Sequence, residues 1–212
     1  MIRNNNIDYN QVIGIKEAEK IVEILKRHYP GIFDGLKIKY GGYYCYDDFR
    51  HIVYIQHDVD LTEEDEIREN AVIDIVNKKY GLNLGYSKRE KSIHAFLHEL
   101  GHAADISYKK AFGQYEEYME SEEHDIDIFE LKKCDYLNTR KELSKVYGKI
   151  IELNPIGNEI KLEELNSKMK KLEIELEETA KELDWDYREI ITEKAADKFS
   201  ADLLKGLCRG LI

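Results

Sequence analysis

The chain has 212 residues, a formal net charge of −11 and 35% charged residues. This acidic balance excludes a non-specific nucleic-acid binder and a polybasic membrane patch, and no stretch approaches the length of about 18 apolar residues that spans a membrane. Three scattered cysteines, Cys45, Cys134 and Cys208, indicate reduced thiols rather than a disulfide framework. Because the first residues also lack the apolar core of a signal peptide, we expect a cytoplasmic protein.

The first part of the chain predicts a helix followed by short strands. Apolar residues recur at helical spacing over residues 15–29. Alternation of apolar and polar residues predicts strands over 36–40 and 51–56, and residues 43–46 favour a further strand entered through a glycine turn. We expect a small mixed or antiparallel sheet, whose edge could bind an extended peptide by strand addition.

A polar loop and a second helix follow. Thr62 is a suitable N-cap for a helix over 63–79, with Asp65 in its first turn, and Gly81 closes the helix. Residues 57–60 read His-Asp-Val-Asp. We interpret them as a polar loop, with a second metal site as the alternative.

The next helix begins at a capping box. Ser87 would accept a hydrogen bond from the amide of Glu90, and the Glu90 side chain would reach back. The helix then presents a broad apolar surface made of Ile93, Phe96, Leu97, Leu100, Ala103 and Ala104. Gly101 lies among them, although glycine costs a helix about 1 kcal/mol relative to alanine. That cost is understandable if Gly101 faces a cleft and lets another backbone or a ligand approach.

This helix carries an HExxH motif at residues 98–102. His98 and His102 are one turn apart on one face, so their neutral imidazoles can hold one metal ion together. Glu99 is rotated by about 100° from His98, which places its carboxylate beside a metal-bound water. This arrangement of zinc and a general base is typical of a metallopeptidase. The alternative is a pair of hydrogen-bonded core histidines around a packing glycine.

A catalytic zinc usually has a third protein ligand. His94 is in register with the motif, but three ligands on one straight helix would span about 12 Å. We therefore interpret His94 as a neighbour of the site. Asp105 is the other nearby candidate, and it falls one residue short of a full turn after the motif. Tyr108 occupies the position ten residues after His98 where the elongated metzincin motif takes a ligand, so that motif is absent.

A stronger candidate for the third ligand lies on a second amphipathic helix, predicted over 189–204. Its buried stripe consists of Ile190, Ala196, Phe199, Leu203 and Leu204. Glu193 and Asp197 are spaced by one turn on a single face beside that stripe.

At this point the sequence resembles the gluzincin metallopeptidases, whose third ligand is the Glu of an E-x-x-[Ser/Ala]-[Asp/Asn] segment. Glu193, Ala196 and Asp197 match that segment, and Phe199 matches two residues later. The segment is most similar to that of the ImmA/IrrE-type peptidases, and residues 98–105 resemble the HELGHAxD run of the anthrax lethal-factor-like family. The resemblance implies that Glu193 is the third zinc ligand and that Asp197 orients a ligand histidine through its other ring nitrogen.

The unusual part of the chain is the stretch before that helix. Residues 114–130 hold eight acidic side chains and no Lys or Arg. We interpret them as a solvated face, with a site for a basic partner or a cation as the alternative. Two long helical runs, broken by a turn signal at 154–158, favour an antiparallel hairpin packed like a coiled coil. Residues 127–184 would then contact a protein substrate, mediate dimerisation or cap the site.

These patterns together predict a helix-dominated α+β fold. A zincin-like part over 1–110 would hold the small sheet and the active-site helix. Residues 111–185 would form the acidic segment and the inserted helical hairpin, and residues 186–212 would complete the metal site.

The function expected from this site is hydrolysis of a protein or peptide by a zinc metallopeptidase, with an endopeptidase favoured and with no nucleic-acid or membrane partner. His98, His102 and Glu193 would bind zinc, and Glu99 would act as the general base. Tyr187 is a candidate for stabilising the oxyanion, because the resembling families place a Tyr near there. Two alternatives stay open: a non-catalytic zincin scaffold that binds a partner through its hairpin, and a metal-dependent hydrolase of another amide.

Overall fold

The computed structural model describes residues 10–57, 62–153 and 158–206. Part of the 57–60 loop, most of the 154–158 turn and Cys208 lie outside these residues, so the interpretations placed on them stay predictions. Within the described residues, six helices accompany one three-stranded sheet, which confirms a helix-dominated α+β fold. No helix in this part of the chain is long and apolar enough to cross a membrane.

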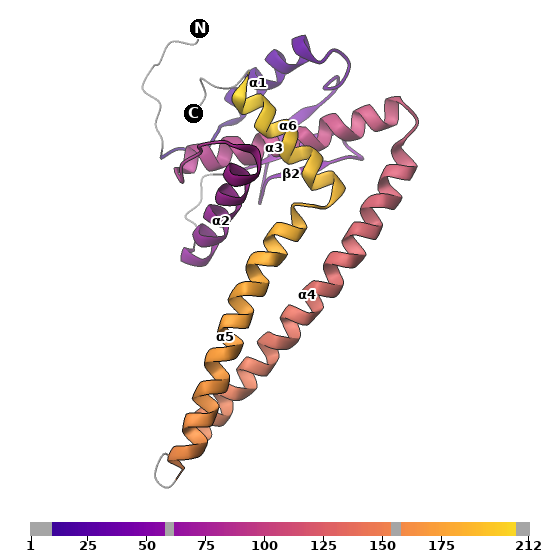
Figure 1. The fold of residues 1–212 in the computed structure, drawn as a ribbon. Coiled ribbons are helices and arrows are strands. Elements are labelled where there is room, and N and C mark those ends of the chain that lie inside the picture. Colours follow the sequence, from indigo (N-terminus) through magenta and orange to yellow (C-terminus); the bar gives the residue numbers. More distant parts are fainter. Residues whose placement is uncertain (1–9, 58–61, 154–157, 207–212) are drawn as a thin grey trace. The chain divides into compact units, whose positions relative to one another are not determined.

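The chain divides into two compact units (Figure 1). Unit 1 contains the described residues up to Glu120 together with those from Ile191 onward, and unit 2 contains Ser121–Ile190. Unit 1 is built from α1 (Ile15–His28), β1 (Lys37–Gly41), β2 (Cys45–Asp47), β3 (Ile52–Gln56), α2 (Glu63–Tyr80), α3 (Lys88–Ala111) and α6 (Ile191–Lys205). The long helices α4 (Tyr115–Glu152) and α5 (Glu159–Tyr187) supply unit 2, and the first turns of α4 belong to unit 1.

The sheet is mixed, with strand order β1-β3-β2. Strand β1 runs parallel to β3, whereas β2 runs antiparallel to it. The third strand therefore exists, but it begins at Cys45 rather than at residue 43. Strand β3 takes the central position because it is the most apolar, with Ile52, Val53 and Ile55 buried.

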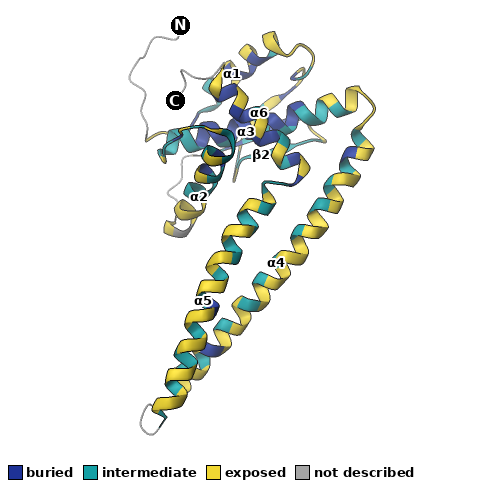
Figure 2. Ribbon diagram, viewed as in Figure 1, coloured by how far each residue is buried: buried dark blue, intermediate teal, exposed yellow. Residues whose placement is uncertain are grey.

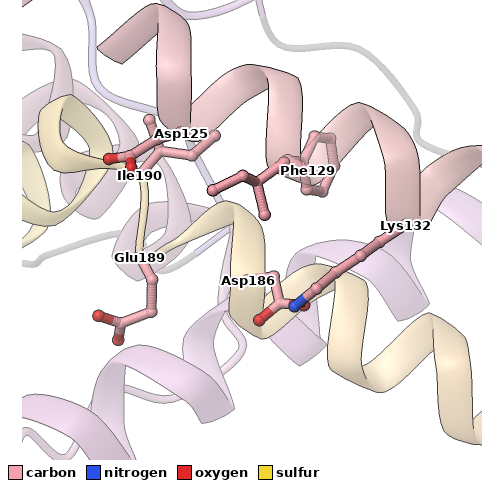
Figure 3. A pocket seen from close by; sticks show the side chains of 7 residues that line it. Asp125, Phe129, Lys132, Asp186, Glu189 and Ile190 are labelled. Carbon is pink, nitrogen blue, oxygen red and sulfur yellow. The ribbon is translucent and has the colours of Figure 1, made fainter. Parts of the chain in front are cut away.

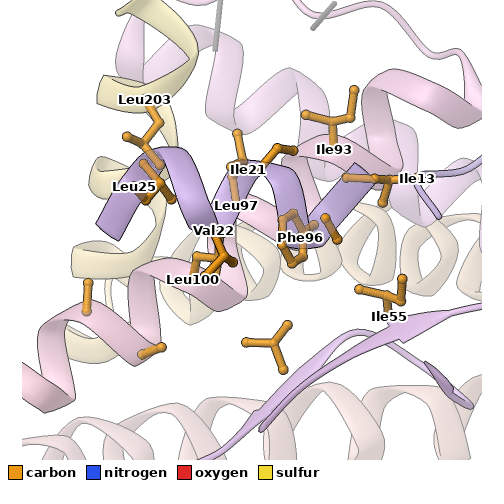
Figure 4. Packing of buried hydrophobic residues seen from close by; sticks show 14 of the residues in the cluster. Ile13, Ile21, Val22, Leu25, Ile55, Ile93, Phe96, Leu97, Leu100 and Leu203 are labelled. Carbon is orange, nitrogen blue, oxygen red and sulfur yellow. The ribbon is translucent and has the colours of Figure 1, made fainter. Parts of the chain in front are cut away.

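The core of unit 1 packs α1 and α3 against one face of this sheet (Figure 4). Helix α1 contributes a stripe at helical spacing, and α3 contributes the apolar surface expected from its sequence. The central members are Ile21, Val22, Leu25, Val53, Ile55, Ile93, Phe96, Leu97, Leu100 and Leu203. Burying one such side chain stabilises a fold by about 1.5–3 kcal/mol, so this layer holds α3 firmly in place.

Helix caps determine where α2 and α3 begin. Thr62 and Asp65 form the reciprocal capping box of α2, and Gly81 ends the helix in the left-handed conformation with φ 64°. At α3, Ser87 accepts from the Glu90 amide at 3.2 Å as predicted. The Glu90 carboxylate also reaches back as predicted: it accepts from the Ser87 hydroxyl at 2.6 Å and, further upstream, from the Gly85 amide at 2.9 Å.

Unit 2 is a pair of antiparallel helices. Lys132 of α4 contacts Asp186 of α5 at 2.6 Å, and Tyr147 of α4 donates to Glu173 of α5 at 2.5 Å. Later residues of α4 thus contact earlier residues of α5, so the two helices run in opposite directions. Most side chains of the pair are exposed (Figure 2), whereas Val146 of α4 and Leu172 of α5 are buried. The acidic segment is the continuous beginning of α4, since this helix runs without a break from Tyr115.

Candidate metal centre

Helix α3 brings His98 and His102 together on one face. Their Nε2 atoms lie 3.1 Å apart, and their rings meet edge to face with centroids 4.7 Å apart. Both side chains are largely shielded, with 8% and 15% of their surface exposed. A one-turn separation in a helix is sufficient for this meeting, so the pair follows directly from the sequence.

Helix α6 adds the Glu193 carboxylate to the pair. Oε2 lies 3.1 Å from His98 Nε2, and Oε1 lies 3.5 Å from His102 Nε2. These three residues offer donor atoms that all lie within 4.8 Å of one another and could hold a metal ion. Donors at tetrahedral angles around an ion, each bonded at about 2.1 Å, are separated by roughly 3.4 Å. The observed spacings fit that requirement.

The charge state of Glu193 suits a ligand. Burial alone would raise the pKa of this carboxyl, but the adjacent imidazoles of His102 and His98 outweigh the burial and hold its pKa well below the usual range. Glu193 is therefore ionised at neutral pH. A buried carboxylate beside two imidazoles is an arrangement that a cation would stabilise further.

Asp197 fixes the orientation of His98. It lies one turn after Glu193 on α6, is fully buried, and its Oδ1 lies 2.8 Å from His98 Nδ1. Because an ionised carboxylate can only accept, His98 donates from Nδ1, and the neutral ring then carries its lone pair on Nε2. That lone pair points to the side where Glu193 and His102 lie. Asp197 is thus positioned to prepare a candidate ligand nitrogen.

Close packing of α3 on α6 makes these contacts possible. A Cβ added at Gly101 would meet the backbone of Ala196 at 2.6–3.0 Å, which no real side chain tolerates. Gly101 therefore faces another backbone in direct contact, rather than a cleft or a ligand. Since Ala196 lies between Glu193 and Asp197 on α6, the absence of a side chain at Gly101 sets how closely those two carboxylates approach the histidines.

Glu99 lies beside the three candidate ligands. Burial raises the pKa of its carboxyl, and Glu193 adds to this effect, while His98 and His102 oppose it. The backbone N–H of Tyr46 on β2 donates to the Glu99 carboxylate. Sequence reasoning missed this neighbour, because nothing in the short run of β2 signals which helix it will contact.

Cys45, the first residue of β2, is a second unexpected neighbour. Its half-buried thiol has a raised pKa, caused by burial and then by the charges of Glu99 and Asp47. Strand β2 is also an edge of the sheet among the described residues, since it pairs with β3 alone. The carboxylate of Glu99 therefore faces a sheet edge.

Other sequence candidates lie apart from the three ligands. His94 is buried with its ring centroid 6.3 Å from that of His98, and it is not among the residues whose donor atoms converge. Asp105 accepts a hydrogen bond from the buried Tyr118 hydroxyl. Tyr108 is exposed. Tyr187 belongs to unit 2, where its ring packs against Phe129 at 5.6 Å, and its catalytic role stays a prediction.

Unit 2 contains a small hollow of its own, with a volume of about 130 Å³ (Figure 3). Asp125, Phe129 and Ile190 are among the residues that line it, and Lys132 extends across it to Asp186. None of the metal-ligand candidates lines this hollow. Its volume is below the several hundred Å³ typical of a small-molecule site.

Comparisons of the chain with protein-family models, with curated proteins and with solved structures found no significant match. The functional interpretation of the site therefore rests on its geometry and its chemistry.

Proposed function

We propose that this chain is a zinc-dependent metallopeptidase with a zincin-like catalytic unit, acting as an endopeptidase on protein or peptide substrates. The observation that carries the proposal is the convergence of His98, His102 and Glu193, with Glu99 beside them. Two imidazole nitrogens and one carboxylate leave a fourth tetrahedral position open, and this is the composition of catalytic rather than structural zinc sites.

Zinc is the metal that this donor set favours. Imidazole with carboxylate suits zinc, and the spacings of 3.1–3.5 Å match a tetrahedral ion. When bound, zinc would polarise the scissile carbonyl and lower the pKa of the attacking water. Asp197 would hold the His98 ring in the tautomer that presents Nε2 as a donor.

Glu99 would move the proton in this reaction. Its carboxylate would accept a proton from the attacking water and deliver it to the nitrogen of the departing amine. Burial raises the pKa of Glu99, so the carboxylate is a stronger base than an exposed one. The hydrogen bond from the Tyr46 backbone would keep the carboxylate oriented while the proton is transferred.

The sheet edge beside Glu99 supports a peptide substrate. Strand β2 carries the backbone that touches Glu99, and an extended substrate could lie along this edge and continue beyond it in both directions. Such binding favours cleavage within a chain over removal of terminal residues. Tyr187 is retained as the proposed oxyanion stabiliser, and Tyr187→Phe is the variant that would reveal a lost hydroxyl.

The decisive experiment compares the purified protein with its Glu99→Gln variant. Both are examined for zinc by elemental analysis, for folding by circular dichroism, and for cleavage of a peptide library by mass spectrometry. We expect equal zinc content and equal folding, with cleavage reduced by about 10²–10⁴-fold in Glu99→Gln. If both proteins bind zinc equally and neither cleaves any peptide, the chain is instead a binding scaffold. Hydrolysis of small amides but not of peptides would identify another class of hydrolase.

A further inference from the structure

A groove runs along the outer side of unit 1, between α1 and β1, with a volume of about 510 Å³. On the helix side it is lined by Glu19, Val22, Glu23 and Lys26, which share one face of α1. On the other side it is lined by the consecutive residues 36–39. A groove with a helix along one wall and a strand along the other has the form that accepts an extended chain.

The strand wall has backbone groups available for pairing. In the described part of the chain, β1 pairs with β3 alone and is an edge of the sheet. The amide of Lys37 donates to the carbonyl of His51 at 3.1 Å, on the side of β3. Along a strand, the N–H and C=O groups of successive residues point alternately to the two sides. The groups of Ile38 and Tyr40 therefore point away from β3. An added strand would pair with them.

The side chains of β1 divide between the two faces of the sheet. Ile38 is opposite Val53, which belongs to the core, so Ile38 faces the same side as α1. Together with the buried Val22 and Leu36 it makes an apolar floor. Lys37 and Lys39 point to the opposite face. An added strand would therefore meet apolar contacts on one face and lysines on the other.

Two lysines at this edge form no ion pair with any residue that the structure describes. They are Lys37 and Lys39, and both are exposed. Lys26, across the groove, differs because it pairs with Glu23 at 2.8 Å. The carboxylates of the groove, Glu19 and Glu23, lie on α1, whereas the two lysines point to the other face of β1. The lysines therefore favour acidic side chains on that face of an added strand.

We propose that the groove between α1 and β1 is a docking site, separate from the metal centre, for an extended segment of a partner protein in which acidic and apolar residues alternate. The segment adds as a strand to the outer edge of β1. Its acidic side chains lie beside Lys37 and Lys39, and its apolar side chains cover Val22, Leu36 and Ile38. The opposing account is that the lysines only keep the edge from pairing, as lysines on exposed edges often do.

The test uses two fluorescein-labelled peptides, one alternating Glu with Val and the other alternating Lys with Val, measured by fluorescence anisotropy on the full chain. The Glu99→Gln variant serves as the background, so that no peptide is cleaved whether or not the protein is a peptidase. We expect the Glu peptide to bind and the Lys peptide to bind at least about tenfold more weakly. The charge-reversed variant Lys37→Glu/Lys39→Glu should invert this preference.

A matched control changes two exposed lysines of unit 2, Lys161→Glu/Lys170→Glu, which alters net charge equally. It should leave the binding of both peptides unchanged. Strand addition also predicts that amide exchange at Ile38 and Tyr40, followed by NMR, slows when the Glu peptide binds. No binding of the Glu peptide at about 1 mM, equal weakening by the control, or unchanged exchange at both amides would each overturn the proposal.

Discussion

Replacing Gly101 with alanine separates local helix propensity from tertiary packing. Propensity alone predicts that Gly101→Ala stabilises α3 by about 1 kcal/mol. The added Cβ would lie 2.6 Å from Ala196 Cα and 2.7 Å from its carbonyl oxygen, where ordinary contacts begin at 3.4 Å. The two helices would have to separate by roughly 1 Å, and overpacking of this kind costs about 1–3 kcal/mol. We expect a packing cost near the upper end of this range, because the backbone of Ala196 cannot rotate away as a side chain could. After the propensity gain of about 1 kcal/mol is subtracted, the net loss of unfolding free energy is about 2 kcal/mol.

The same displacement would move the two carboxylates of α6 away from the histidines. The contact of 2.8 Å between His98 and Asp197 would be lost or lengthened, and zinc affinity should fall by about 10–100-fold. Urea unfolding and chelator competition measure the two effects. Gly148→Ala is the matched control, since Gly148 lies within α4 and a Cβ added there would meet no atom within 4 Å, and it should raise stability by up to about 1 kcal/mol. A Gly101→Ala protein with wild-type stability and zinc affinity would refute the reasoning.

Three further outcomes test the site and the fold around it. Glu193→Ala should deplete the metal measured by elemental analysis, whereas Asp105→Ala should not, and the reverse pattern would replace one ligand with the other. Asp197→Asn keeps an acceptor oxygen and should weaken zinc binding modestly, while Asp197→Leu should cost about 10–100-fold in chelator competition; equal and negligible effects would make Asp197 a purely structural group. Burial lowers the pKa of His51 below its ordinary value of 6.5, so the unfolded chain binds a proton that the folded protein does not, and stability falls as pH drops below 6.5. His51→Asn, which tolerates the φ of 54° there, should lose less stability than the wild type between about pH 7 and 5 in urea titrations.

Local rules account for the part of the site that was predicted from sequence. His98 and His102 meet because a helix joins positions one turn apart, whatever the remaining fold does. Glu193 and Asp197 share a face of α6 for the same reason, and the resemblance to gluzincins associated that face with the histidines. Spacing alone could not have done so, because no local rule relates positions separated by ninety residues.

The remaining features depend on tertiary contacts. The partner of Gly101 could not be predicted, since a glycine has no side chain whose pattern would indicate what it faces. The contact of Glu99 with Tyr46 depends on β3 lying between β1 and β2, and the sequence left the sheet mixed or antiparallel. The Glu90 side chain could reach either of two nearby amides, and only the observed conformation of the turn selects Gly85.

Because α6 follows the helical hairpin, the candidate metal centre joins two parts of the chain that a long insertion separates. Joining Glu193 to His102 brings together positions separated by ninety residues, and the lost chain entropy costs about 4.6 kcal/mol of free energy. A bound ion would contribute to offsetting that loss in the folded state alone, so metal binding and the docking of α6 should be thermodynamically coupled. During synthesis, His98 and His102 would emerge well before Glu193. A nascent chain would therefore hold an incomplete set of the candidate ligands until α6 has been synthesised.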